Sequence, residues 1–158
     1  MPQSRTPVNI RQARPADLDA LIALEESTFD IDRISRRQWR RHIGSTSATV
    51  LVTGDARSID AAAVVFYRRN ARMARLYSLA VGAHARGSGL GGVLLAAAEA
   101  DARARDCDAM QLEVRPDNPA AITLYERRGY ARAARLPHFY EDGTDAWRYE
   151  KSLTTVMP

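Results

Sequence analysis

The sequence predicts an α/β (α+β) fold built on one mixed, mostly antiparallel seven-stranded central sheet flanked by four helices. Segments with strand alternation and segments with helical spacing follow one another in the order β-α-α-β-β-β-α-β-α-β-β. Short turns between the early strands favour hairpins, whereas helices between the later strands favour crossovers. A sheet with both kinds of connection is mixed, and we expect helices on both of its faces.

A chain of 158 residues, 46% of them hydrophobic, fits one domain, and we expect a single domain over 1–158 with its core at about 8–153. The single Cys107 excludes an internal disulfide. Residues 1–7 are polar, which predicts no signal peptide. The apolar run 61–67 is far shorter than the roughly 20 residues of a membrane span. We therefore expect a cytoplasmic protein without membrane contact.

The net charge of +4 comes almost wholly from arginine, because Lys151 is the only lysine. A composition biased towards arginine, alanine and aspartate explains most of this charge. A moderate positive field still favours an anionic ligand. Acidic residues are interleaved with the basic ones, and no basic platform with aromatic residues accompanies them, so nucleic acid is not expected as a partner.

The first 45 residues or so carry one strand signal and two helix signals. Residues 8–13 alternate apolar and polar side chains, as a half-exposed strand does. Pro15 then opens a helix, and Ser35 with Gln38 forms the capping-box pattern that starts a second helix through Ile43. The apolar positions of the first helix, interrupted by the polar Glu25, are Leu18, Leu21, Ile22 and Phe29.

Three strands are expected next, at 48–53, 61–69 and 73–81. The pair Gly54-Asp55 is predicted to form the first turn between them, and Asn70-Ala71 the second.

The second half of the chain alternates strands with helices. Apolar residues at i, i+3, i+4, i+7 and i+8 predict an amphipathic helix from Leu90 to about Arg105, and 110–114 is a strand. Asn118-Pro119 caps and begins the next helix, which Gly129 ends. The last two strands are expected at 130–136 and 145–153.

The segment Arg86-Gly87-Ser88-Gly89-Leu90-Gly91 is the first chemical signature, because it follows a strand and opens an amphipathic helix. Glycine lets the backbone approach a ligand closely and adopt positive φ. Free N–H groups at a helix start, together with the helix dipole, attract an anion, and a pyrophosphate suits such a loop. The structural alternative is a tight strand-to-helix turn that needs glycine for its geometry alone.

The spacing of this loop excludes two other phosphate-binding motifs. A Walker loop needs Gly-Lys-Ser/Thr, and the dinucleotide fingerprint needs Gly-x-Gly-x-x-Gly after a first strand. The loop instead resembles motif A of the GNAT superfamily, Arg/Gln-x-x-Gly-x-Gly/Ala, and this resemblance implies a GNAT fold with acetyl-CoA as the cofactor. The residues implied to bind the cofactor here are Leu79, Ala80, Val81, Arg86, Gly87, Ser88, Gly89, Leu90, Gly91 and Gly92.

A second cluster lies on the following strand and helix. Glu113 points away from the face of the strand that carries Leu112 and Val114, and Asn118 and Tyr125 share one helix face because they are seven apart. Acyl transfer to an amine needs a proton acceptor for the amine and benefits from a donor to the thiolate. Glu113 is a candidate acceptor, directly or through water, and Tyr125 a candidate donor.

Each of these residues also has a purely structural interpretation. Glu113 would then pair with Arg115 or with an arginine elsewhere, Asn118 would only cap its helix, and Tyr125 would only pack.

The cluster resembles the Leu-Glu-Val-Arg…Asn…Ala-x-x-Leu-Tyr…Gly-Phe signature of the ribosomal-protein alanine acetyltransferase family, with Tyr130 in place of Phe. The resemblance implies that Glu113 is the base, that Asn118 contacts CoA and that Tyr125 is the acid. Together with motif A it spans 76–130, roughly a third of the chain.

The segment 139–146, Phe-Tyr-Glu-Asp-Gly-Thr-Asp-Ala, resembles the Tyr-Tyr-x-Asp-Gly-x-Asp-Ala segment of enzymes that acetylate protein N-termini, with Phe139 as a departure. A plain Asp-Gly hairpin turn is the structural alternative. The resemblance implies an acceptor wall made of Phe29, Tyr77 and Tyr140.

These signatures together predict an acetyl-CoA-dependent N-acetyltransferase without a metal, acting by direct attack of a primary amine. The expected acceptor is the N-terminal α-amine of a protein or peptide, with ribosomal proteins among the candidates. Two alternatives are a small-amine acetyltransferase, for a polyamine, antibiotic or amino acid, and a non-catalytic acyl-CoA-binding regulatory module. A monomer or weak homodimer is expected.

Overall fold

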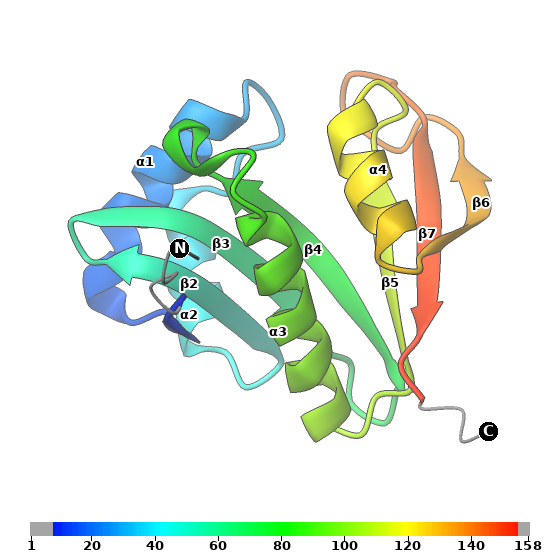
Figure 1. Ribbon diagram of the computed structural model, residues 1–158, viewed down its shortest axis with the longest axis horizontal. Helices are drawn as coiled ribbons and strands as arrows, with labels where there is room; N and C mark the ends of the chain where they lie inside the picture. Colours follow the sequence, from blue (N-terminus) through cyan, green and yellow to red (C-terminus); the bar gives the residue numbers. More distant parts are fainter. Residues whose placement is uncertain (1–7, 155–158) are drawn as a thin grey trace, which may run out of the picture.

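The computed structural model describes residues 8–154, and its strands form one seven-stranded sheet in the order β1-β2-β3-β4-β5-β7-β6 (Figure 1). The pair β4 and β5 is parallel and the other neighbours are antiparallel, so the predicted fold class is confirmed. The strands are β1 Ile10–Gln12, β2 Ala48–Asp55, β3 Ser58–Phe66, β4 Met73–Val81, β5 Ala109–Val114, β6 Ala131–Leu136 and β7 Ala146–Ser152.

Four α-helices cover the two faces of the sheet within the described residues. In Figure 1, α1 (Leu18–Thr28) and α2 (Arg36–Gly44) lie behind the sheet and α3 (Leu90–Ala104) crosses in front of it. The fourth helix, α4 (Pro119–Arg127), stands beside β5 and β7. Apolar residues on both faces therefore have a helix to pack against.

Helix ends follow the local signals in the sequence. The Ser35 hydroxyl accepts from the backbone N–H of Gln38, whose side chain accepts from the N–H of Ser35, so the capping box is confirmed. Asn118 caps α4 by accepting from the N–H of Ala121, and Gly129 follows that helix with φ +93°. Such contacts span only three or four residues, which is why the sequence predicts them well.

The predicted turn at Gly54-Asp55 is wrong. β2 continues through Asp55 and β3 begins at Ser58, so Ala56 and Arg57 make the turn. Gly54 lies instead at a register irregularity between the two strands, with φ +110°, where a Cβ would stand 2.3 Å from the Ser58 carbonyl oxygen. The glycine serves a close backbone approach within the ladder.

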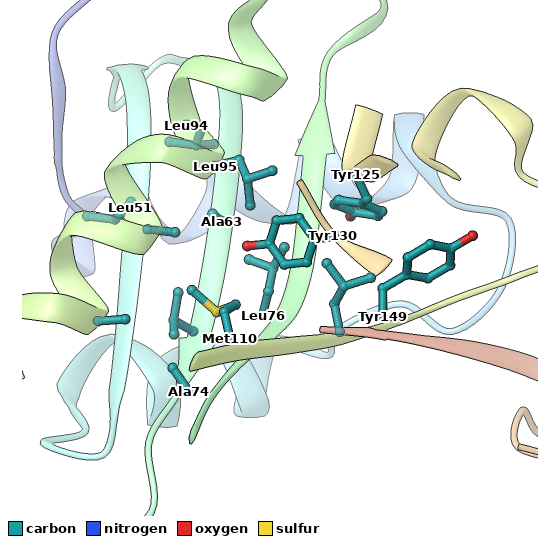
Figure 2. Packing of buried hydrophobic residues seen from close by; sticks show 14 of the residues in the cluster. Leu51, Ala63, Ala74, Leu76, Leu94, Leu95, Met110, Tyr125, Tyr130 and Tyr149 are labelled. Carbon is teal, nitrogen blue, oxygen red and sulfur yellow. The ribbon is translucent and has the colours of Figure 1, made fainter. Parts of the chain in front are cut away.

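A hydrophobic core lies on each face of the sheet. The core between the sheet and the α1/α2 pair contains Leu21 and Trp39, which are almost fully buried. The core under α3 joins Leu94 and Leu95 to residues of β3, β4 and β5 and to Tyr125, Tyr130 and Tyr149 (Figure 2). This second core connects β3 and β4 with β5 and β7.

The strands β4 and β5 pair only at their beginnings, from Met73–Leu76 to Ala109–Leu112, and then diverge (Figure 1). Tyr77 is the next residue of β4 and has no partner in the β3 register, so it forms a β-bulge. Bulges bend a strand and disrupt its ladder locally. Within residues 8–154, no strand therefore pairs with the backbone of β4 beyond Leu76 on the side that faces β5.

Candidate active site

The glycine loop joins β4 to α3 through a short 3-10 turn, η2 (Ala83–Ala85). Gly87 and Gly89 have φ +80° and +82°, and Gly89 is the N-cap of α3. Only glycine adopts this conformation without strain. A Cβ built on either residue meets no atom within 4 Å, so the loop borders open space at both positions.

The next two glycines serve close contacts between elements. A Cβ on Gly91 would lie 3.3 Å from Leu124 Cδ2 and 3.5 Å from Val81 Cγ2, so glycine lets the start of α3 approach α4 and β4. The guanidinium of Arg128 lies directly against Gly92, in the first turn of α3.

Arg128 was missed by the sequence reasoning. A basic residue at the end of a helix is explained by the helix dipole alone, so the sequence carries no further signal. In the fold, its guanidinium lies against Gly92, within the first turn of α3.

The polar side chains of the loop hydrogen-bond to nearby backbone carbonyl oxygens. Arg86 Nε donates to the Val81 carbonyl oxygen at 3.4 Å, and the Ser88 hydroxyl donates to the Ala85 carbonyl oxygen. Anion binding here would therefore depend on backbone N–H groups, because both side chains donate to backbone carbonyl oxygens. Val81 ends β4, so the predicted Leu79-Ala80-Val81 segment leads directly into the loop.

Glu113 is buried on β5, with its side chain only 5% exposed, and two arginines neutralise it. Arg75 Nε lies 3.1 Å from Glu113 Oε1, and Arg148 Nη2 lies 3.5 Å from the same oxygen. A buried carboxylate needs such partners. Of the two structural pairings considered for Glu113, the one with Arg115 is wrong and the one with arginines elsewhere is correct.

Tyr125 of α4 is buried in the core under α3, and its ring makes an edge contact with Tyr130 at 5.9 Å between centroids. Burial raises the pKa of Tyr125, so its hydroxyl is protonated at neutral pH. Within residues 8–154 this hydroxyl makes no hydrogen bond, whereas the neighbouring Tyr130 hydroxyl donates to Glu99. Tyr125 therefore keeps a donor available for a ligand.

Arg115 connects the two loops at the end of β5. It pairs with Asp32 in the α1–α2 loop and, at 3.0 Å, with Asp142 in the β6–β7 loop. Its guanidinium also stacks on the ring of Tyr140 at 4.1 Å. Burial raises the pKa of Tyr140 to about 12, so this hydroxyl is also protonated at neutral pH.

The other two predicted acceptor residues lie in different surroundings. Tyr77, on the β4 bulge, is 39% exposed and stacks on Phe66 at 4.4 Å. Phe29 ends α1 and packs, half-buried, against the core beneath α1 and α2. Tyr77 is thus open to a ligand, whereas Phe29 mainly supports the loop that follows it.

Within residues 8–154 no three His, Cys, Asp or Glu side chains gather in a way that would hold a metal ion. Nor does that part of the chain contain a helix with the length and apolar character of a membrane span.

Comparison with known proteins adds a family assignment. Residues 19–130 match the model of the acetyltransferase (GNAT) family. N-alpha-acetyltransferase 30 of Schizosaccharomyces pombe is 39% identical over 71 residues, which are 45% of this chain and 47% of that protein. Mycothiol acetyltransferase of Salinispora tropica is 34% identical over 145 residues, covering 79% of this chain and 45% of that protein. The chain thus spans about half the length, or less, of the curated relatives it matches.

Among solved structures, the fold is similar to that of a ribosomal-protein alanine N-acetyltransferase from Escherichia coli. The TM-score is 0.81 and the identity 24%, with 94% of this chain and 96% of that chain covered. At this identity the likeness concerns the fold.

Proposed function

The chain belongs to the acetyltransferase (GNAT) family, and we propose that it transfers an acetyl group from acetyl-CoA to the N-terminal α-amine of a protein or peptide. The observation that carries the proposal is the hydroxyl of the buried Tyr125, which makes no hydrogen bond within residues 8–154, in a sheet whose strands β4 and β5 stop pairing after Leu76.

The glycine loop is the proposed site for the diphosphate of acetyl-CoA. Gly87 and Gly89 border open space, and the first N–H groups of α3 have no acceptor inside the helix. A diphosphate placed there would also meet the helix dipole and the cation of Arg128. The loop conformation thus fits a ligand of this charge.

Acetyl-CoA supplies an activated thioester whose carbonyl carbon an amine attacks. Glu113 is proposed to accept the amine proton through a water molecule, because Arg75 and Arg148 already contact its carboxylate. The Tyr125 hydroxyl is proposed to donate a hydrogen bond to the departing sulfur. Its raised pKa favours hydrogen-bond donation over full proton transfer to a thiolate.

The acceptor class is inferred from the loop that contains Tyr140. Its sequence resembles that of enzymes acting on protein N-termini, and one relative is named as an N-alpha-acetyltransferase. The exposed ring of Tyr77 and the phenol of Tyr140 offer an apolar surface and a hydrogen-bonding group to a peptide backbone.

A small amine is the second candidate acceptor. The alignment with a mycothiol acetyltransferase extends over 79% of this chain, further than the alignment with the N-alpha-acetyltransferase.

A direct test offers acetyl-CoA with two acceptor panels, a library of short peptides and a set of small amines, and follows release of the CoA thiol. We expect thiol release with free peptides, none with the same peptides blocked at the N-terminus, and mass spectrometry that places the acetyl group on the α-amine. Turnover confined to small amines or to lysine side chains would contradict the proposal.

A further inference from the structure

A cavity of about 690 Å³ opens on the face of the sheet that α2 borders, and Glu113 lies in its wall. Its volume is in the range typical of ligand sites. Its floor comes from β4, β5 and β7, through Arg75, Glu113 and Arg148, and one side comes from the end of α2, through Arg41 and His42. The cavity therefore begins at the proposed proton acceptor and runs away from it along the sheet.

The cavity is separate from the glycine loop. None of its lining residues comes from 79–92, the segment proposed to hold the diphosphate. Leu112 and Val114, on either side of Glu113 along β5, face the α3 core, so Glu113 points to the opposite face of the sheet. An anion bound in this cavity would be distinct from the phosphates of acetyl-CoA.

Positive charge dominates the lining, with the four arginines Arg41, Arg68, Arg75 and Arg148 against the single carboxylate of Glu113. Arg75 and Arg148 share that carboxylate. Arg41 and Arg68 are exposed and form no ion pair within residues 8–154. Burial lowers the pKa of His42, so its ring is neutral at neutral pH and leaves the balance unchanged.

We propose that this arginine-lined cavity binds the part of the acceptor that follows the acetylated amine, and that it selects peptides with carboxylate side chains there. This inference rests on the function proposed above. An acidic segment would give Arg41 and Arg68 the carboxylate partners that residues 8–154 do not supply. A basic segment would meet four guanidiniums around one neutralised carboxylate, and the like charges would repel it.

The experiment compares three peptides with identical first two residues, followed by glutamates, glutamines or lysines. We expect kcat/KM to fall in that order, by about fivefold or more between the acidic and neutral peptides, since each exposed ion pair changes affinity only modestly. The difference should lie in KM, and added salt should reduce it.

Two variants locate the effect. Replacing both free arginines, Arg41→Gln with Arg68→Gln, should remove the preference, whereas Arg57→Gln, in the exposed β2–β3 turn, should keep it. Binding of the N-acetylated acidic peptide to the CoA-saturated protein, measured by calorimetry, gives a second readout that needs no turnover.

The outcomes separate the two proposals. Equal kcat/KM for the three peptides would overturn the acidic preference and leave peptide acetylation standing. If none of the peptides is acetylated, the proposed function is overturned. The cavity assignment then depends on the calorimetry, and equal affinity for acidic and neutral peptides would refute it. A preference that survives in the double variant would also refute it.

Discussion

Tyr130 stands where the similar family signature has Phe, and its hydroxyl gives the substitution a structural reason. It donates to Glu99 Oε2 at 2.8 Å, while Lys151 Nζ lies 2.9 Å from Glu99 Oε1. The Glu99 side chain is only 6% exposed, so both partners satisfy a buried carboxylate. Figure 2 shows the Tyr130 ring beside Leu95 of α3, in the core that joins the helix to the sheet.

Single residues differ in how far the sequence reveals their role. Glu113 was identified as an unusual carboxylate on an interior strand, because alternation along β5 is a local property. Its partners Arg75 and Arg148 lie more than 30 positions away along the chain, one on each side. Such pairings depend on the order of strands in the sheet, which a residue pattern does not contain.

Tyr125→Phe tests the proposed donor. We expect kcat to fall by about 10-fold or more, the low end of general-acid contributions, with the Kd for CoA nearly unchanged. Stopped assays of thiol release together with calorimetry would measure both. Tyr130→Phe is the matched control, because it removes a neighbouring hydroxyl that already donates to Glu99. This variant should lower the free energy of unfolding and leave kcat nearly unchanged. Equal turnover by Tyr125→Phe and the parent would remove this hydroxyl from the mechanism.

Asp17→Asn tests a buried ion pair. The Asp17 side chain is 2% exposed and accepts from Arg11 at 2.7 Å. We expect the free energy of unfolding at neutral pH to fall by about 2–4 kcal/mol, somewhat below the usual cost of breaking a buried pair, because Arg11 remains 21% exposed. Asp19→Asn, which breaks an exposed pair with Arg36, should change the free energy of unfolding little.

The effect of Asp17 should depend on pH with a defined sign. The hydrogen bonds from Arg11 lower the pKa of Asp17 in the folded protein below its unfolded value. The stabilisation is therefore fully present above the ordinary carboxyl pKa of about 4 and is lost as the pH falls through the folded value. Urea titrations should show the difference in unfolding free energy between parent and Asp17→Asn narrowing as the pH falls below the ordinary carboxyl pKa of about 4; a constant difference would contradict this account.

At the scale of elements, the helices were predicted most closely and the hairpins least. The capping box at Ser35, the cap at Asn118 and the glycine at 129 depend on contacts within one turn. The β2–β3 turn was misplaced because Gly54 signals positive φ in a strand irregularity as strongly as in a turn. Strand ends are decided by a partner strand, which the local sequence does not specify.

The link between the α1–α2 and β6–β7 loops was also beyond sequence reasoning. Arg115 was considered as a partner for Glu113, its neighbour but one along β5, yet it pairs with Asp32 and Asp142. These aspartates lie on loops that approach each other only in the folded chain. We infer that Arg115 positions the two loops that border Tyr140.

Arg115→Gln tests that positioning role. Loss of both ion pairs and of the stacking on Tyr140 should loosen the loops, so we expect KM for a peptide acceptor to rise about 10-fold, with smaller changes in kcat and in the Kd for CoA, consistent with the loss of two partly buried charged contacts. Arg115→Lys, which keeps the charge but lacks the planar guanidinium that reaches both aspartates and stacks on Tyr140, should recover part of the loss. A fall in kcat alone, with KM unchanged, would contradict a role in acceptor positioning.

At the scale of the whole molecule, two parts of the sheet meet along a short parallel seam. The strands β1–β4 form one part and β5, β7 and β6 the other, and the seam runs only from Met73–Leu76 to Ala109–Leu112. The α3 core and the contacts of Glu99 with Tyr130 and Lys151 hold the two parts together at the end where β4 and β5 are paired. The element order predicted a mixed sheet, but the position of this divergence depends on the bulge at Tyr77.

A ligand held by the glycine loop on one part and by α4 on the other should stabilise the whole chain. At a CoA concentration 100 times its Kd, linkage gives about 2.7 kcal/mol. For a domain of this size the midpoint of thermal unfolding should then rise by roughly 5–10 °C. Differential scanning calorimetry with and without CoA would measure the shift.

Two glycine variants separate ligand contact from backbone strain. Gly89→Ala and Gly143→Ala place a Cβ at φ +82° and +84°, and neither Cβ meets an atom within 4 Å. Both variants should therefore lose similar stability without ligand, because alanine is strained at positive φ. Only Gly89→Ala should lose the CoA-dependent rise in the midpoint of thermal unfolding, since only its Cβ enters the space proposed for the diphosphate. An equal rise in both variants would show that CoA binds this fold without the loop at residues 86–91.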